Sequence, residues 1–400
     1  MPFNRRQFLL LGGALGGLGL SVAAQKWAAS QGSSLPADRP LDLNEYSQSS
    51  PESSPESNLE SSPTASSPTA STDPLNPPRG DVRIVVISDL NSQYGSTDYE
   101  IEVDNAIARI PTWQPDLVLC GGDMVAGQQP SLTRSEIEAM WAAFDQHVSA
   151  PLRKANIPYG FTLGNHDASS AQAINGGLLF GTERELASAY WNDPLHDPGL
   201  QFVDRAKFPF YYTFQKKDVF FLSWDASSAQ ISAEQLAWVE QSLSSPAAKA
   251  AKLRIVVGHL PLYGIAIGRD DAGEYLENAE GLRSLLERHQ VHTYVSGHDH
   301  AYYPGHKGDL ELLHCGILGA GVRPLLNGDL SPRKTLTIVD VDLAAARTLY
   351  TTLDATTLEL VNQQELPKLI ASPGGKVLRR DVVWEDLTPA EQAIEYAPRG

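Results

Sequence analysis

The stretch VVISDLNSQYG, residues 85–95, runs from apolar β-branched residues into an acid at Asp89 and then into a polar loop. β-Branched residues favour a strand, and the Asn, Ser and Gly that follow favour a loop. In an α/β sheet, ligand-binding side chains gather beyond the carboxyl ends of the strands. Asp89 and Asn91 are therefore the first candidate site residues.

Four other points of the chain repeat this pattern of an apolar run followed by Gly and polar residues. They are Gly121-Gly122-Asp123, Gly164-Asn165-His166-Asp167, Gly258-His259 and Gly297-His298-Asp299-His300. Because the carboxyl ends of parallel strands share one edge of a sheet, we expect these groups to meet in space. Mixed oxygen and imidazole donors favour Mn, Fe or Zn over calcium or a thiolate-bound zinc. We expect the glycines to let the backbone turn sharply at each strand end.

Short Val/Ile/Leu runs alternate with amphipathic segments after residue 80, which predicts an α/β (α+β) fold with a mixed, partly parallel sheet covered by helices. The candidate strands are residues 82–88, 116–120, 159–163, 211–215, 219–224, 253–257, 293–296, 310–314, 335–341 and 348–353. The candidate helices are residues 103–110, 136–154, 233–243 and 277–289. The last four strands are hairpin-like, and we expect them to add a second sheet.

The five motifs, in this order, resemble those of the calcineurin-like metallophosphoesterase superfamily over roughly residues 82–353. The segment WDASSAQISAEQLAWVEQSL, residues 224–243, is also similar to the one that precedes the Gly-His strand in these enzymes. The resemblance implies a four-layer αββα sandwich of two mixed β-sheets flanked by helices. It also implies two divalent or trivalent metal ions, and hydrolysis of phosphomonoesters or phosphodiesters by a hydroxide that the two ions share.

The resemblance implies a role for each motif residue. Six residues would hold the ions: Asp123 bridging both, Asp89 and His300 on the first, and Asn165, His259 and His298 on the second. His166 would be the general acid that protonates the leaving alkoxide, and Asp167 would help to orient it. Two alternatives stay open, since His166 could be a packed core histidine and Asp167 a plain helix cap.

Asn91 departs from the superfamily pattern, which usually has a histidine at this position. Its amide oxygen is a weaker donor than imidazole, although the superfamily already uses an Asn amide oxygen at the position of Asn165. Purple acid phosphatases also lack this histidine, but they carry a tyrosine where this chain has Ala126. Two interpretations stay open: a two-ion enzyme that holds its first ion loosely, with Asn91 among the ligands, or a weak or inactive scaffold that binds metal or phosphate.

Residues 1–29 resemble a twin-arginine export signal, with Arg5-Arg6-Gln7-Phe8-Leu9 followed by a Gly-rich apolar run. This predicts an exported, periplasmic or extracytoplasmic protein, which contacts the membrane only through this segment if the segment stays uncleaved. Residues 30–80 are rich in Ser, Pro and Glu, which is typical of a disordered linker. Residues 81–360 would form the metallophosphoesterase domain, and residues 361–400 are a tail without an assigned role.

The formal net charge of -17 argues against a surface that neutralises nucleic-acid phosphates. We therefore expect a small-molecule or lipid phosphate ester as substrate and no nucleic-acid partner. An anionic substrate needs a local positive centre, which bound metal ions supply.

Two further features leave alternatives open. Cys120 and Cys315 are expected to be buried free thiols, although an exported location permits a disulfide. The charged segment from Arg269 through GEYLENAEG, residues 273–281, either covers the site or forms a solvated loop.

Overall fold

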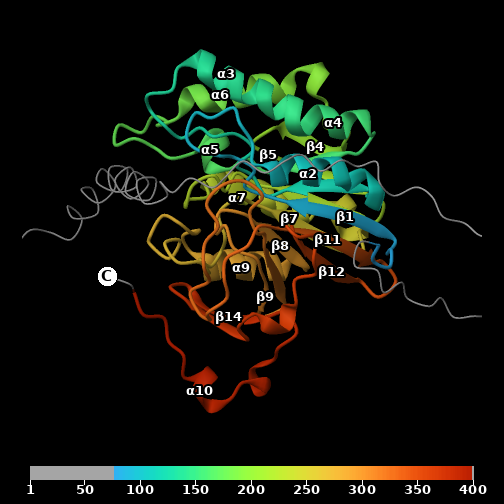
Figure 1. The fold of residues 1–400 in the computed structure, drawn as a ribbon, viewed down its shortest axis with the longest axis vertical. Coiled ribbons are helices and arrows are strands. Elements are labelled where there is room, and N and C mark those ends of the chain that lie inside the picture. The colour runs from blue at the N-terminus through green and yellow to red at the C-terminus, as the bar shows by residue number, and fades with distance from the viewer. Residues whose placement is uncertain (1–75, 399–400) are drawn as a thin grey trace, which may run out of the picture. The chain divides into compact units, whose positions relative to one another are not determined.

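The computed structural model describes residues 76–398, so the predicted export signal and nearly all of the predicted linker lie outside the described residues. The described residues form two mixed β-sheets with helices on either side (Figure 1). The predicted fold class is thereby confirmed.

The first sheet has five strands in the order β12-β11-β1-β2-β3. Their bounds are β12 (Arg347–Asp354), β11 (Thr335–Asp342), β1 (Val82–Ile87), β2 (Leu117–Cys120) and β3 (Tyr159–Phe161). β1 lies at the centre, and all six of its residues are buried. It pairs parallel with β2, with Ile84 opposite Leu117, and antiparallel with β11, with Val82 opposite Val341.

The second sheet has nine strands in the order β13-β14-β9-β10-β8-β7-β6-β5-β4. Their bounds are β13 (Leu369–Ser372), β14 (Gly375–Arg379), β9 (Tyr303–Lys307), β10 (Leu310–His314), β8 (Thr293–Ser296), β7 (Leu253–Val257), β6 (Val219–Ser223), β5 (Tyr211–Lys216) and β4 (Gln201–Lys207). The four central strands β6, β7, β8 and β10 are parallel to one another. Antiparallel strands extend both edges.

Helices of different lengths connect the strands. The α-helices are α2 (Ile101–Arg109), α3 (Arg134–Phe144), α4 (Ala150–Lys154), α5 (Asn165–Ala168), α6 (Gly181–Asn192), α7 (Ala233–Leu243), α8 (Pro246–Ala250), α9 (Ala279–Arg288) and α10 (Pro389–Gln392). The 3₁₀ turns are η1 (Ile110–Trp113), η3 (Pro194–His196), η4 (Gln363–Glu365) and η5 (Trp384–Asp386), and the π-helical turn η2 (Asp145–Ser149) joins α3 to α4. None of the described helices is both long and apolar enough to cross a membrane.

Aromatic packing fixes α6 against the first sheet. The ring of Trp191 in α6 stacks on the ring of Phe161 in β3, with centroids 3.9 Å apart, and on Tyr159 at 5.9 Å. Such ring pairs add roughly 0.5–1.5 kcal/mol beyond the free energy of burying their area. On the second sheet, α9 contacts β10.

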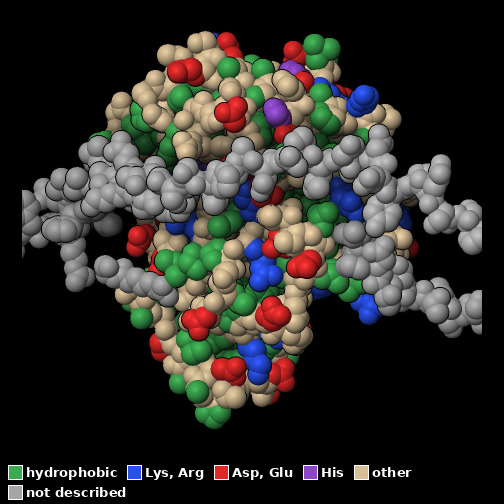
Figure 2. Space-filling model, in the orientation of Figure 1, with side chains coloured by type: hydrophobic (Ala, Val, Ile, Leu, Met, Phe, Trp, Pro, Cys, Tyr) green, Lys and Arg blue, Asp and Glu red, His purple; other side chains and the backbone are tan. Residues whose placement is uncertain are grey.

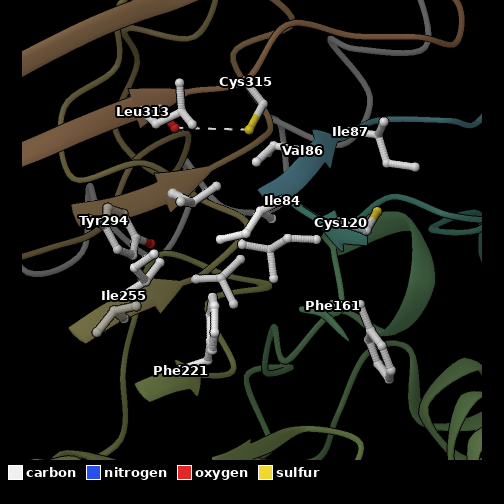
Figure 3. Close-up of a cluster of buried hydrophobic side chains, with 14 of the residues drawn as sticks. Ile84, Val86, Ile87, Cys120, Phe161, Phe221, Ile255, Tyr294, Leu313 and Cys315 are labelled. Atoms are coloured by element: carbon white, nitrogen blue, oxygen red, sulfur yellow. Dashed lines mark hydrogen bonds between the residues drawn. The ribbon is translucent and has the colours of Figure 1, made fainter. Parts of the chain in front are cut away.

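The two sheets share one apolar core, which Figure 3 shows between β1 of the first sheet and β7 and β8 of the second. The hydroxyl of Tyr212 in β5 donates to the carbonyl oxygen of Phe161 in β3 at 2.6 Å. A Cβ at Gly160 would lie 2.7 Å from the ring of Phe214, so the close approach of β3 to β5 requires glycine there. Cys120 and Cys315 are buried free thiols in this core, as expected.

The expected grouping of the last four strands is wrong. β11 and β12 form a hairpin in the first sheet, because β11 takes the free edge of β1, while β8 and β10 belong to the parallel centre of the second sheet. Part of the predicted tail is also ordered: β13 and β14 pair with each other, and β14 pairs with β9. The second sheet therefore includes part of the predicted tail, as far as Arg379.

Candidate metal centre

The five motifs meet beyond the strand ends, as the sequence predicts. Asp89 follows β1, Asp123 follows β2, and Asn165 begins α5 after β3, while His259, His298 and His300 follow β7 and β8 of the other sheet. All of these side chains are buried. Asp89, Asp123 and His259 each offer one ligand atom within 4.8 Å of the others. The ligand candidates thus come from both sheets.

Short distances link four donor atoms, from Asp123 through His259 and Asn165 to His298. The Asn165 Oδ1 atom lies 2.9 Å from Nε2 of His259 and 3.0 Å from Nδ1 of His298. The Asp123 Oδ2 atom lies 3.3 Å from the same Nε2 of His259. One carboxylate oxygen, one amide oxygen and two imidazole nitrogens are a donor set typical of Zn, Fe or Mn.

A second, smaller group lies beside the first. The His300 Nε2 atom is 3.3 Å from Oδ1 of Asp89. The Asp89 carboxylate is held by its neighbours, since the hydroxyl of Ser88 donates to Oδ2 at 2.6 Å and the backbone N–H of His298 lies 3.2 Å from both oxygens. Asp89 is thereby fixed with one oxygen toward His300.

Two buried atoms of this site have no hydrogen-bond partner among the described residues: Oδ2 of Asp123 and Nε2 of His300. A buried polar atom without a partner costs about 1–3 kcal/mol, so such atoms call for an explanation. In the rings of His300 and His259, the other nitrogen already has a partner. Nδ1 of His300 lies 2.9 Å from the carbonyl oxygen of Gly321, and Nδ1 of His259 lies 2.7 Å from that of Gly121. Each ring therefore points Nε2 inward, the arrangement typical of metal-ligating histidines. The residues fit a metal ion.

The imidazole of His259 faces a carboxylate. Although burial lowers its pKa, the nearby Asp123 carboxylate raises the pKa of His259 to about 9. Because only neutral imidazole binds a metal, an ion bound here would displace a proton from His259.

Four of the candidate ligands have a left-handed backbone, which non-glycine residues seldom adopt. The φ angles are 51° for Asp89, 55° for Asp123, 69° for His298 and 53° for His300. Such conformations cost about 1–3 kcal/mol each and cluster at functional sites. The strain lies where the donor atoms converge.

The glycines of the motifs serve close approach more than turning. Gly122 has a φ of +98° and fits the predicted sharp turn, and a Cβ there would also lie 2.7 Å from Nδ1 of His259. Gly297 has no left-handed backbone, but a Cβ there would lie 2.7 Å from Oδ2 of Asp89. At Gly297 the expectation of a glycine-dependent turn is therefore wrong, because what requires glycine is the space taken by Ser88 and Asp89.

His166 lies at the rim of the site. Its Nδ1 lies 2.9 Å from the carbonyl oxygen of Gly127, and its Nε2 lies 3.9 Å from Oδ2 of Asp123. The exposed ring of Tyr94 lies against it, with centroids 5.1 Å apart. Burial lowers the pKa of His166, and the Asp123 carboxylate partly offsets this.

Asp167 contacts backbone amides. Its Oδ1 accepts from the N–H groups of Met124 and Val125 at 2.7 and 2.9 Å, and its Oδ2 accepts from Gly164 at 2.8 Å. Burial raises the pKa of Asp167 to about 7. These bonds match the helix-cap alternative and tie the loop after β2 to the loop after β3. Within the described part of the chain, no hydrogen bond joins the Asp167 carboxylate to the ring of His166.

Asn91 is buried beside the site. Its backbone N–H donates to the carbonyl oxygen of Asp123 at 3.2 Å, and its own carbonyl oxygen accepts from Ala320 at 3.0 Å. Its side-chain amide makes no hydrogen bond to any residue that the structure describes. No described residue therefore engages the amide oxygen.

Two functional candidates that the motifs did not reveal come from the charged loop after His259. Oε2 of Glu274 lies 2.9 Å from Nε2 of His298 and 2.6 Å from Nη1 of Arg269. Burial alone would raise the pKa of Glu274, but His298 and Arg269 hold this pKa well below its usual range. Arg269 and Glu274 thus lie against the site, whereas residues 271–273 and 277–278 of the same segment are exposed, and the clustered charges were the only sequence signal.

Comparison with known families matches residues 82–302 to the family model described as calcineurin-like phosphoesterase. The chain belongs to the calcineurin-like phosphoesterase family. The family is one of phosphoesterases, and the buried ligand cluster of this chain lies where its five motifs meet.

Two solved structures illustrate the similarity of this phosphoesterase to known proteins. A purple acid phosphatase from yellow lupin seeds is 15% identical with a TM-score of 0.49, and the match covers 81% of this chain and 59% of the lupin chain. GAP50, the anchor in the inner membrane complex of Plasmodium, is 15% identical with a TM-score of 0.44, and the match covers 70% of this chain and 87% of that chain. Comparison with curated proteins gives no match.

Proposed function

We propose that this calcineurin-like phosphoesterase is a metal-dependent enzyme that holds two ions, of Mn, Fe or Zn, and hydrolyses phosphomonoesters or phosphodiesters. Asp89, Asp123 and His300 would hold the first ion, with Asn91 as an added, weaker ligand. Asp123, Asn165, His259 and His298 would hold the second. The observation that carries the proposal is the buried group of Asp89, Asp123 and His259, whose ligand atoms lie within 4.8 Å of one another, together with Asn165 Oδ1, which lies 2.9 Å from His259 and 3.0 Å from His298.

The chain's own residues would divide the remaining chemistry. Bound ions would lower the pKa of a water molecule and neutralise charge on the phosphoryl oxygens. His166 would protonate the leaving alkoxide. Its Nδ1 is fixed by the carbonyl oxygen of Gly127, which leaves Nε2 directed toward Asp123.

Metal analysis paired with an ester panel tests the proposal. The purified protein is freed of metal, reloaded with Mn²⁺, Fe²⁺ or Zn²⁺, and assayed with p-nitrophenyl phosphate and bis(p-nitrophenyl) phosphate. We expect two bound ions and turnover that requires them. The Asp123→Asn variant should lose both the bound ions and the turnover, because it replaces the one carboxylate that the two ions would share.

The second candidate is a binding scaffold of the same fold without turnover, and Asn91 is the observation that favours it. An amide oxygen is a weaker donor than an imidazole nitrogen, so the first ion would bind less tightly. Binding of the phosphoryl group depends on that ion. Ion binding without hydrolysis of any ester, under all three metals, would establish the scaffold. The placement of His166 at the rim favours the enzyme.

We further propose that the protein acts outside the cytoplasm on a small-molecule or lipid phosphate ester. The twin-arginine motif and the negative net charge support this proposal. Where Figure 2 shows the described residues uncovered, acidic side chains are interspersed with Lys and Arg, unlike the clustered basic side chains of a nucleic-acid-binding surface.

A further inference from the structure

The loop after β2 contacts two residues of the site that come from α5. Gln128 accepts a hydrogen bond from the side chain of Asn165, and Gly127 accepts one from the ring of His166. We propose that Gln128, anchored by Glu183, is a positioning residue that fixes the Asn165 amide so that its oxygen faces the second ion. The inference rests on the proposed function, because it assigns a role toward that ion.

The hydrogen-bond pattern of Asn165 depends on which way its amide points. Nδ2 donates to Oε1 of Gln128 at 2.7 Å, which leaves Oδ1 directed toward His259 and His298. If the amide turned by 180°, its NH₂ group would face the two imidazoles, and an NH₂ group cannot ligate a cation. The acceptor on Gln128 therefore selects the ligating orientation.

Gln128 is itself held in place. Its backbone is left-handed, with a φ of +66°, and its N–H donates to Oε1 of Glu183 in α6 at 3.0 Å. A Cβ at Gly127 would lie 3.3 Å from the same Glu183 carboxylate, so this side chain packs directly under the loop. Glu183 thus holds the backbone of the loop that carries both the Gln128 side chain and the Gly127 carbonyl oxygen bonded to His166.

Packing alone does not explain a buried acid at position 183, because burial of its carboxyl group destabilises the fold. Only 3% of Glu183 is exposed, and its Oε2 is buried without a hydrogen-bond partner among the described residues. An acid with one unsatisfied oxygen destabilises a fold. Its contacts are with the loop that orients Asn165 and His166, which accounts for its presence.

The experiment measures Mn²⁺ binding to the metal-free full chain by titration calorimetry. Gln128→Met keeps the size of the side chain but removes the acceptor, and we expect the second ion to bind about 10- to 100-fold more weakly, the usual effect of losing such a supporting group. Gln128→Glu keeps an acceptor and should bind this ion as tightly as the wild type or more tightly. Glu183→Ala removes the carboxylate that accepts from the Gln128 backbone N–H, and it should lower the affinity for the second ion by about 10-fold. Gln129→Met makes the same change at the exposed neighbouring residue and should bind like the wild type.

Wild-type affinity in Gln128→Met would overturn the inference, and so would equal losses in Gln128→Met and Gln128→Glu, because the effect would then come from packing. Wild-type affinity in Glu183→Ala would remove Glu183 from the arrangement. A wild-type protein that binds no ion would instead overturn the proposed function, and this inference with it.

Discussion

A histidine at the Asn91 position would add an imidazole nitrogen to the donors around Asp89 and His300. Asn91→His is expected to raise the affinity for the first ion by about 10-fold, because imidazole is a stronger donor to Mn, Fe and Zn than an amide oxygen. Metal retained after dialysis against a weak chelator checks this, with Asn91→Ala as the control that removes the side-chain donor. Unchanged metal content with complete loss of activity would show that Asn91 contacts the substrate.

The proposed proton donor can be tested by choice of leaving group. His166→Asn is expected to lower kcat by about 10²- to 10⁴-fold for an alkyl phosphate, whose leaving group needs a proton. The loss should be much smaller for p-nitrophenyl phosphate, because p-nitrophenolate leaves without one. Steady-state rates for both esters, with metal content measured in parallel, make the comparison. Equal losses for the two esters would remove His166 from this role.

Sequence patterns reached the candidate ligands but not the residues that support them. Asp123 and His259 could be predicted because each follows directly on a strand, and strand ends share one edge of a sheet. Gln128, Glu183 and Glu274 could not, because their contacts depend on the paths of loops that no periodicity describes.

At the scale of elements, the parallel strands were the easiest to predict. β7, β8 and β10 have the predicted bounds, because each is a short, largely buried run with a Gly one or two residues beyond its end. β4 was missed because it is an edge strand with mostly exposed residues, and β9 because its sequence YPGHK contains Pro and Gly. Helix α6 was missed as well, although Leu186, Ala187, Tyr190 and Trp191 have the spacing of one buried helix face.

Helix α6 contributes a pH-dependent term to stability through Glu183. Burial raises the pKa of Glu183 from 4.5 to about 7, so the folded state holds this proton more tightly than the unfolded state. The associated stability is present below about pH 4.5 and is lost as the pH rises through about 7. Glu183→Gln does not titrate, so its free energy of unfolding relative to the wild type should increase over this range, by at most ~1.4 kcal/mol per pH unit. Urea unfolding at pH 5 and pH 7.5 checks the sign, and a constant difference would contradict it.

At the scale of the whole molecule, the candidate ligands join the two sheets. Asp89, Asp123 and Asn165 follow strands of the first sheet, and the three histidines follow strands of the second. Bound metal should therefore stabilise the domain against unfolding, by about 2.7 kcal/mol for each site at a free-ion concentration 100 times its Kd. Calorimetry with Mn²⁺ and with a chelator should show a higher Tm with the ion. Asp123→Asn is the control that should show little change, and equal Tm values for the loaded and stripped wild type would contradict the prediction.

The predicted export signal is tested on the full chain in its own cells. Changing Arg5 and Arg6 together to Lys should keep the protein in the cytoplasm, because twin-arginine export depends on the arginine pair. Cell fractionation followed by immunoblotting measures this, with Arg39→Lys as a matched change outside the motif. Unchanged export of the double variant would contradict the prediction.

The antiparallel pairing of β1 with β11 determines when the first sheet can form during synthesis of the chain. Val82 lies opposite Val341, so the first sheet closes only after the ribosome has released the chain as far as β11. Until then, one edge of an apolar strand stays open to pairing with other chains, which makes incomplete or truncated chains prone to aggregate. Premature termination anywhere before β11 should therefore yield insoluble product.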